Sequence, residues 1–376
     1  MAIEHIEARN TNFELIGIID AFASVIWHSV YFGVGDFEIY TEATPAAVEM
    51  LKKGNYVTRP DDIETGIIEK LDIVNDEQHG VMIAAAGRFV KSILDRRIIY
   101  KLSGNSNAAT ILRGNVEVNI RNIVNENAIA CPFDSSRNFS RLALGELAGI
   151  EAVIVDENGN TAQKQVSYDN LLTYTDGVLK EYGLAAVLLL NTTAKILQYV
   201  VYNGVDRSIN NENGNTPIVF SQEFDNLTSS NYSLDMTAEK NTALIGGEGE
   251  GVDRFYTLLS SGKADLQRRE IFIDASSINK TYKDENDEEK TFTDAEYNTL
   301  LKAKGKQDLA TLIETESFAG VIDIANGNYI YNRDFFLGDI VTVEDKILNK
   351  TANVRVCEIT EIQDENGYNV EAVYNS

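Results

Sequence analysis

The stretch Phe335-Phe336-Leu337-Gly338-Asp339-Ile340-Val341-Thr342-Val343 contains the pattern that decides the fold of this 376-residue chain. Gly338-Asp339 is a turn dipeptide, because glycine accepts backbone angles that other residues avoid and aspartate bonds to its own backbone. The four β-branched residues that follow predict a strand with alternating faces. We therefore expect a turn and a strand here, and we expect four side chains to help close a β-barrel: Phe335, Leu337, Ile340 and Val343.

Short runs rich in Ile, Val, Tyr and Phe recur toward both ends of the chain, separated by turn residues. This pattern is typical of antiparallel barrels and sandwiches. In the N-terminal part the predicted strands are 13–19, 24–30, 36–41, 56–59, 65–74 and 81–87. In the C-terminal part they are 218–220, 231–236, 243–246, 255–259, 269–274, 318–324, 340–344, 352–362 and 370–374. Asp364-Glu365-Asn366-Gly367 separates the last two runs and predicts a hairpin.

Helix signals interrupt the strands at four places. Thr44, Pro45 and Gly54 are start and stop residues for a helix over 45–53. Thr293 and Glu296 predict a capping box for a helix over 294–315, whose apolar face would carry four leucines: Leu300, Leu301, Leu309 and Leu312. Apolar residues at helical spacing predict two more helices, within 107–125 and 169–182, and strands 184–190 and 196–202 complete a small α/β module.

The predicted fold class is mainly β with an α/β insertion, built on two antiparallel β-barrel domains. A chain of this length corresponds to two or three domains at about 150 residues each. We assign residues 1–103 to the first barrel, 104–216 to the α/β insertion, and 217–376, with the helix over 294–315, to the second barrel.

The charge balance argues against direct clamping of nucleic acid. Acidic residues exceed basic ones by 58 − 33 = 25, and the sequence pI is near 4.5. Neutralising phosphates requires clusters of Lys and Arg, and the densest basic groups are only Arg96-Arg97 and Arg268-Arg269. An acidic surface repels other polyanions, so it suits a wall past which DNA slides without binding.

Neither targeting nor disulfide chemistry is predicted. The N-terminal Met1-Ala2-Ile3-Glu4-His5 lacks a basic region followed by an apolar stretch, so we expect no secretory signal. The longest apolar run, 184–190, is much shorter than the roughly 20 residues that cross a bilayer. Cys131 and Cys357 match no ligand or redox spacing and are interpreted as free buried thiols.

No residue is predicted to be catalytic, to bind a cofactor or to hold a metal. The histidines His5, His28 and His79 are not at ligand spacing. Three acidic segments lack the spacing of a calcium loop, and hairpin turns explain the first and third: 156–160, 284–289 and 364–367. The glycine-rich 246–251 lacks the Lys-Ser/Thr of a phosphate loop and carries two carboxylates, so it is interpreted as a turn between strands. No nucleophile elbow or Cys motif indicates a hydrolase.

Eight segments in order resemble siphophage tail proteins of the baseplate and tail-tip hub family, related to contractile-tail trimeric hubs and to the N-terminal region of tail-associated lysins. They are Gly35–Tyr40, Arg59–Asp62 with Gly66–Lys70, Gly87–Phe89 with Leu94–Arg97, Gly204–Ser208, Phe220–Leu227, Gly247–Gly251, Arg268–Glu270 and Phe335–Asp339.

The resemblance implies a homotrimer whose two barrels per subunit make a six-membered ring, with DNA passing through the centre. Its partners would be the tail tube or distal tail protein, the tape measure protein and other tip or fibre proteins. The location would be the virion tail, assembled in the host bacterial cytoplasm, with no membrane contact. Lysin-type members carry further domains, and none is recognised before Ser376, so cell-wall cleavage is expected on another chain.

Two other functions stay open at this stage. The first is a tail-tip module that binds a receptor or carbohydrate, for which the 17 tyrosines give slight support. The second is a wall hydrolase, because glycoside hydrolysis needs only two positioned carboxylates and the chain has 58 acidic residues.

Overall fold

The computed structural model describes residues 2–76, 80–103, 106–156, 160–224, 226–283, 288–322, 329–345 and 350–375. The chain forms two compact units. The first comprises Met1–Ser92, Leu184–Leu234 and Glu316–Ser376, and the second comprises Ile93–Gly183 and Asp235–Thr315. These limits do not coincide with the predicted boundaries at 103/104 and 216/217, because β13 (Ala185–Asn191) contacts a strand of the first unit while α4 (Asp294–Leu309) packs against α3 (Leu171–Glu181) in the second.

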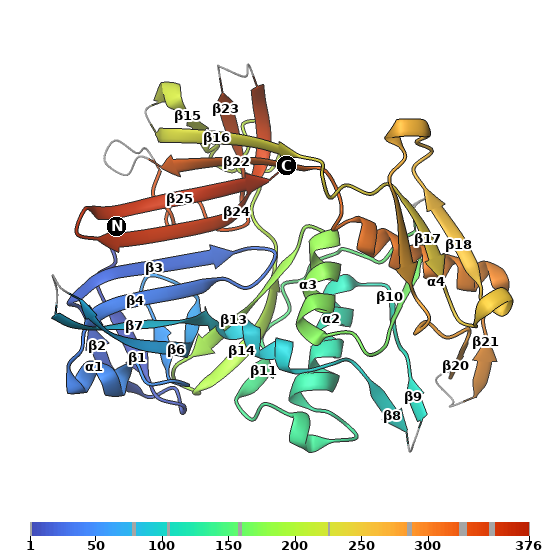
Figure 1. Ribbon diagram of the computed structural model, residues 1–376, viewed down its shortest axis with the longest axis horizontal. Helices are drawn as coiled ribbons and strands as arrows, with labels where there is room; N and C mark the ends of the chain where they lie inside the picture. The colour runs from blue at the N-terminus through green and yellow to red at the C-terminus, as the bar shows by residue number, and fades with distance from the viewer. Residues whose placement is uncertain are drawn as a thin grey trace. The chain divides into compact units, whose positions relative to one another are not determined.

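The first unit is built on one large sheet, in which 13 of the described strands take part. Its order is β16-β22-β25-β24-β3-β4-β7-β6-β5-β1-β2, and β15 pairs with β23, which pairs with β24 (Figure 1). The bounds are β1 Ile6–Arg9, β2 Leu15–Ile19, β3 Phe22–Val30, β4 Asp36–Glu42, β5 Tyr56–Thr58, β6 Thr65–Asp76, β7 Gly80–Phe89, β15 Val219–Ser221, β16 Leu227–Asp235, β22 Thr315–Ile322, β23 Ile340–Asp345, β24 Lys350–Asp364 and β25 Gly367–Asn375. Among the described strands the order ends at β16 and at β2, so no closed barrel is formed.

The pairing of β3 with β24 joins the two ends of the sequence in this sheet. Trp27 lies opposite Glu361, and on its other side opposite Phe37 of β4. Two separate hydrophobic cores lie along the sheet: one surrounds Trp27 and Phe89, and the other surrounds Phe220, Phe335 and Tyr374. The first unit therefore contains two β-rich halves, one from each end of the chain.

The stretch from Phe335 to Val343 lies in the second of these cores. The turn at Gly338 and the strand that follows are as predicted, and Phe335 and Val343 are buried. Ile340 is only half-buried, because the alternation of β23 directs Val341 and Val343 into the core. These side chains pack between strands rather than close a barrel.

The remaining elements of the first unit also follow the sequence pattern. The short helix α1 (Pro45–Met50) is capped by Thr44, whose Oγ1 accepts from the Ala47 N–H. The predicted hairpin joins β24 to β25, with Asp364 opposite Gly367. β13 pairs with β14 (Ile196–Tyr202) along its whole length. The strand β1 carries no turn signal of its own and was not predicted.

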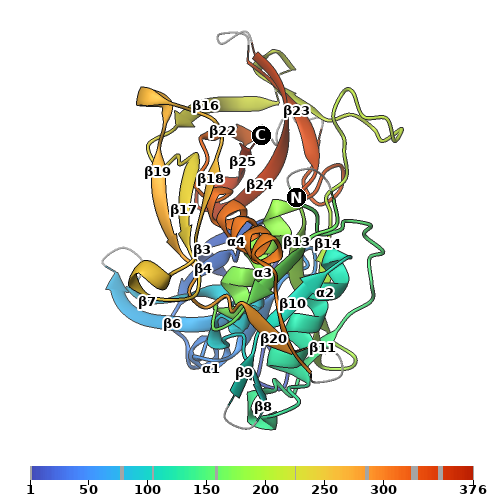
Figure 2. The same ribbon diagram turned by 90° about the vertical axis from the view of Figure 1, so that its right-hand side faces the viewer.

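The second unit combines helices with small sheets. Helix α4 covers one face of the three-stranded sheet β18-β17-β19, as the second view shows (Figure 2). The bounds are β8 Lys101–Ser103, β9 Ser106–Ala108, β10 Thr110–Arg113, α2 Val116–Val124, β11 Leu142–Leu144, β12 Gln163–Val166, β17 Thr242–Gly246, β18 Tyr256–Ser260, β19 Glu270–Asp274, β20 Thr281–Lys283 and β21 Glu289–Thr291. No helix in the described part of the chain is long and apolar enough to cross a membrane.

The helix predicted within 107–125 is shorter than expected, since only Val116–Val124 is helical. The preceding β10 pairs instead with β12, a strand that was not predicted. Gly114 separates the two elements with φ +74°, and the side chain of Asn115 then accepts from the Val118 N–H as the helix cap. A glycine in the left-handed region ends regular structure, so the helix cannot begin before residue 115.

Helix α4 begins at the predicted capping box and ends at Leu309, six residues before the predicted end. The Thr293 hydroxyl accepts from the Glu296 N–H, and Glu296 Oε2 accepts from the Thr293 N–H. We expect Thr293→Ala to destabilise the second unit by about 1 kcal/mol, because it leaves an N-terminal N–H without an acceptor. Urea unfolding followed by circular dichroism measures this effect.

Thr299→Ala is the matched control, because Thr299 is an exposed residue in the interior of α4 and alanine has the higher helix propensity. It should leave the unfolding midpoint unchanged or raise it. Equal losses in the two variants would contradict the importance of the cap.

Candidate functional site

Arg59 is the centre of a buried ion cluster in the first unit. It follows β5, and its side chain is fully buried. Nη1 and Nη2 donate to both carboxylate oxygens of Glu361 at 2.8 and 2.9 Å, while Nε and Nη2 donate to Asp61 at 3.0 and 2.6 Å. The guanidinium also lies 5.5 Å from the ring centroid of Trp27. Planar paired contacts of this kind are a property of arginine, and here they join residues 302 positions apart.

The protonation states of this cluster follow from the pairing. Burial lowers the pKa of Arg59, but the hydrogen bonds with Asp61 and Glu361 raise it further than burial lowers it. Burial raises the pKa of Asp61, yet the hydrogen bond from Arg59 brings it below its usual value. The Tyr368 hydroxyl donates to Glu361 Oε1 at 2.5 Å, and burial beside that carboxylate raises the pKa of Tyr368. Arg59 and Asp61 therefore stay charged at neutral pH, and Tyr368 keeps its proton.

Asp339 is the centre of a second buried cluster in the same unit. Its Oδ1 accepts from the Val205 N–H at 2.8 Å, and its Oδ2 accepts from Arg207 Nε at 2.8 Å and from the Phe336 N–H at 3.0 Å. Backbone hydrogen bonds from Ile340 N to Val205 O and from Arg207 N to Ile340 O continue the contact. Through these hydrogen bonds the Asp339 carboxylate holds the segment after β14 against the start of β23.

Two glycines permit this close approach. A Cβ on Gly204 would lie 1.8 Å from the carbonyl oxygen of Gly338, and a Cβ on Gly338 would lie 2.2 Å from Cε2 of Tyr31. Gly338 also has φ +93°. The Tyr31 hydroxyl accepts from the Gly204 N–H at 3.2 Å. The backbones are thus in direct contact, which only glycine allows.

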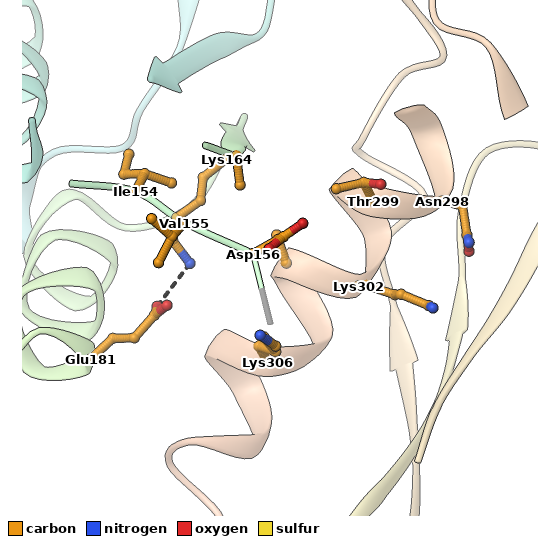
Figure 3. Close-up of a pocket in the computed structure, with 11 residues that line it drawn as sticks. Ile154, Val155, Asp156, Lys164, Glu181, Asn298, Thr299, Lys302 and Lys306 are labelled. Carbon is orange, nitrogen blue, oxygen red and sulfur yellow. Dashed lines mark hydrogen bonds and ion pairs between the residues drawn. The ribbon is translucent and has the colours of Figure 1, made fainter. Parts of the chain in front are cut away.

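A cavity of about 140 Å³ lies in the second unit. Figure 3 shows Lys164 of β12 pointing to Glu181 of α3, with Nζ 2.8 Å from Oε2, while Asn298, Thr299, Lys302 and Lys306 come from α4. The Lys164 side chain is buried and already paired. The lining combines both signs of charge, so we assign no reaction to it.

The residues singled out from the sequence are scattered. His79, residues 157–159 and residues 284–287 lie outside the described residues. Segment 246–251 joins β17 to β18 as the predicted turn. Cys131 and Cys357 are buried, as predicted, and no disulfide joins them. Among the described side chains no group of three His, Cys, Asp or Glu residues is arranged to hold a metal ion. That the chain has no catalytic, cofactor or metal site stays a prediction.

Of the two histidines that the structure describes, His28 is the one that lies beside carboxylates of other strands. Its Nε2 lies 3.2 Å from Glu358 Oε2 and its Nδ1 lies 3.5 Å from Asp36 Oδ2, so it connects β3 to both neighbouring strands. The hydrogen bond with Glu358 raises the pKa of His28 despite partial burial, and the same bond lowers the pKa of Glu358.

Stability should depend on pH through this histidine. A histidine whose pKa is raised on folding stabilises the folded state. This contribution is complete below the pKa of the unfolded chain, about 6.5, and is lost as the pH rises through the pKa of the folded protein. It is also lost in acid, as the pH falls through the lowered pKa of Glu358. We expect His28→Gln to cost on the order of 1 kcal/mol near pH 6 and less near pH 9. Urea midpoints at both pH values test this, with His5→Gln as the control, and a pH-independent difference would contradict it.

The sequence indicates no role for Arg59 or Glu361, and for Asp339 it indicates only that of a turn residue. A signal was present, because Arg59 and Asp339 lie in two of the segments that carry the resemblance, Arg59–Asp62 and Phe335–Asp339. The structure brings these two segments and Gly204–Ser208 to one place. Glu361 carries no such signal, since it is one acidic residue among many in a long strand.

Nearly the whole chain matches a known protein family. The model of the siphovirus ReqiPepy6 Gp37-like protein family matches residues 5–374. The chain belongs to this family. It is therefore a member of a family of phage tail proteins, as the resemblance of its eight segments predicted.

Solved structures share the fold. The tail protein from Neisseria meningitidis MC58 is 12% identical over 99% of this chain and 96% of its own, with a TM-score of 0.57. The 43 kDa tail protein of prophage MuSo2 from Shewanella oneidensis is 14% identical over 99% of this chain and 98% of its own, with a TM-score of 0.55. At these identities the likeness concerns the fold. No protein of curated function matches the chain.

Proposed function

We propose that this chain is a structural component of the tail tip or baseplate of a phage or phage-like particle. Three copies would form a hub that joins the hexameric tail tube, or the distal tail ring, to the tip. The observation that carries the proposal is membership of a phage tail protein family over residues 5–374. A fold shared over 99% of the chain with two tail proteins, one of them from a prophage, supports it.

The two β-rich halves of the first unit suit a joint between six-fold and three-fold partners. Each half has its own core, one around Trp27 and one around Phe335. Three subunits with two β-rich halves each would present six similar parts to a hexameric tube and three equivalent faces to the tip. The buried clusters of Arg59 and Asp339 would then fix the spacing of those halves, because each ties segments from distant parts of the sequence together.

The charge of the chain suits a DNA channel through this ring. With a net charge of −25, a channel wall would repel the genome and let it slide, whereas a basic wall would retain it. The chain would act by assembly, without catalysis and without a cofactor, and its partners would be the distal tail, tape measure and other tip or fibre proteins.

The first test is the mass of the assembled protein. The monomer is 41.7 kDa, so light scattering on the purified chain alone should give three times this mass. With the co-expressed distal tail protein, the complex should contain three copies of this chain in addition to the partner. A species that stays monomeric under both conditions would contradict the hub. A trimer structure with a neutral or basic channel lining would remove the proposed role of the charge.

A further inference from the structure

A cavity of about 490 Å³ opens between the two buried clusters of the first unit. Its walls come from three loops, residues 60–64 after β5, 202–205 after β14 and 331–339 before β23, together with the buried Ser29 of β3. At its edge Ile63 is 60% exposed and Phe336 is 42% exposed. Because these residues at its edge are exposed, solvent and a partner protein can both reach the cavity. Its volume is sufficient for a small ligand or a single side chain.

The described lining of the cavity is acidic and includes no positively charged side chain. Four carboxylates line the cavity. Asp61 is committed to Arg59, and Asp339 is committed to Arg207. The other two, Asp62 and Glu64, have no Lys or Arg within ion-pair distance in the described part of the chain. Two carboxylates are therefore available to a cation from outside.

Glu64 is the lining carboxyl group with a buried oxygen, Oε2, that lacks a hydrogen-bond partner among the described residues. Burial, together with the neighbouring Asp62, raises the pKa of Glu64 to about 8, although Lys91 opposes the shift. Burial likewise raises the pKa of Asp62, although Arg59 opposes the shift. Among the described residues, its Oδ1 accepts from the Glu64 backbone N–H at 2.7 Å, and its Oδ2 lies 3.4 Å from Asn332 Nδ2. Burying a carboxyl group without a hydrogen-bond partner destabilises the folded protein. A donor that enters the cavity and bonds to this group would offset that cost.

The other walls suit the stem of a basic side chain. The rings of Tyr202, Tyr331 and Phe336 and the side chains of Ile63 and Leu337 line the cavity. Aromatic faces attract cations and pack on methylene groups. An anion would be repelled, and no group of three ligating side chains is arranged for a metal in the residues described. The combination of an apolar wall and two carboxyl groups without a Lys or Arg partner favours an organic cation.

We infer that this cavity is a docking site for a lysine or arginine side chain presented by a partner protein, with Asp62 and Glu64 as its carboxylate partners. A protein side chain is favoured because the loops around the cavity offer exposed apolar contacts, Ile63 and Phe336, beside the charged floor. This inference concerns one pocket of one subunit and does not depend on the trimer. A negative result of the peptide titration would therefore leave the proposed hub intact, and a monomeric mass would leave this docking site intact.

The test is a titration of the full chain, labelled with ¹³C in the isoleucine methyl groups, with the tripeptide acetyl-Gly-Arg-Gly-amide. The Ile63 methyl should shift with an affinity in the millimolar range. The same tripeptide with citrulline, which has the shape of arginine without its charge, should bind about tenfold more weakly. Because arginine stays charged, affinity should rise roughly tenfold from about pH 6.5 to about pH 9 as Glu64 ionises.

Two conservative variants assign the contact. Glu64→Gln should fold, since the native carboxyl is largely protonated at neutral pH, and it should weaken binding at about pH 9 and remove most of the pH dependence. Asp62→Asn keeps an oxygen for the Glu64 N–H and should weaken binding at every pH. Asp364→Asn, on the β24–β25 turn, is the matched control and should bind as the unchanged chain does. Equal binding of the citrulline peptide, no shift of Ile63, or binding unaffected by both pocket variants would overturn the inference.

Discussion

Arg59→Met will destabilise the first unit by about 3–5 kcal/mol, the largest effect expected of any single charged residue in this chain. Methionine fills much of the same space, so the loss comes from Glu361, which is left without its cation in a nearly fully buried position, with 3% of its side chain exposed. Asp61 loses its partner too, but it is 42% exposed and can be solvated. The measurement is the urea midpoint, followed by the fluorescence of Trp27, the only tryptophan.

Arg333→Met is the matched control. Arg333 also pairs with an aspartate, Asp334 at 2.8 Å, but its side chain is 58% exposed, and exposed ion pairs contribute about 0–1 kcal/mol. The double variant Arg59→Met with Glu361→Met should recover a large part of the stability, because it removes the uncompensated charge. If it is as unstable as Arg59→Met, the loss arises from packing rather than from a buried charge.

Gly338→Ala should be nearly as damaging, at about 3 kcal/mol or more. Two effects combine at this position. Its φ of +93° lies in the region that side-chain-bearing residues avoid, and the added Cβ would lie 2.2 Å from Cε2 of Tyr31. That ring is buried, and its hydroxyl is held by the Gly204 N–H, so the ring has no free space to move into.

Gly54→Ala separates these two effects. Gly54 has φ +88°, but nothing lies within 4 Å of an added Cβ, so only the backbone strain of roughly 1–2 kcal/mol should be seen. The difference between the two urea midpoints then measures the contact with Tyr31. Equal losses would show that the close packing of Gly338 contributes nothing.

The elements of the first unit were largely predictable, since local sequence decides them. In β3 from Ser24 to Val30 buried residues alternate with partly buried ones, and in β4 from Asp36 to Thr41 they alternate with exposed or partly buried ones. This period of two is a local property of a strand. The capping box at Thr293 was equally local. The helix within 107–125 was overestimated, because the apolar spacing continues through residues that pair with β12, and a strand partner more than 50 residues away is not visible in a local pattern.

The candidate site was not predictable from residue types alone. Arg59 and Asp62 are three residues apart, yet one is held by Glu361 and the other has no cation partner in the described chain. Both facts depend on where β24 and the loop after β14 lie. An acid-rich sequence provides many candidate carboxylates, and burial selects among them.

The sequence by itself determined the mainly β class, most strand positions, the family and the turn at Gly338-Asp339, because each follows from short-range periodicity, turn chemistry or a recognisable order of segments. Only the tertiary structure decided that the two ends of the chain share one open sheet, that Arg59 meets Glu361 and that Asp62 and Glu64 face a cavity. The physical reason is that desolvation and ion pairing depend on distances between residues hundreds of positions apart, and these distances exist only once β3 and β24 have paired.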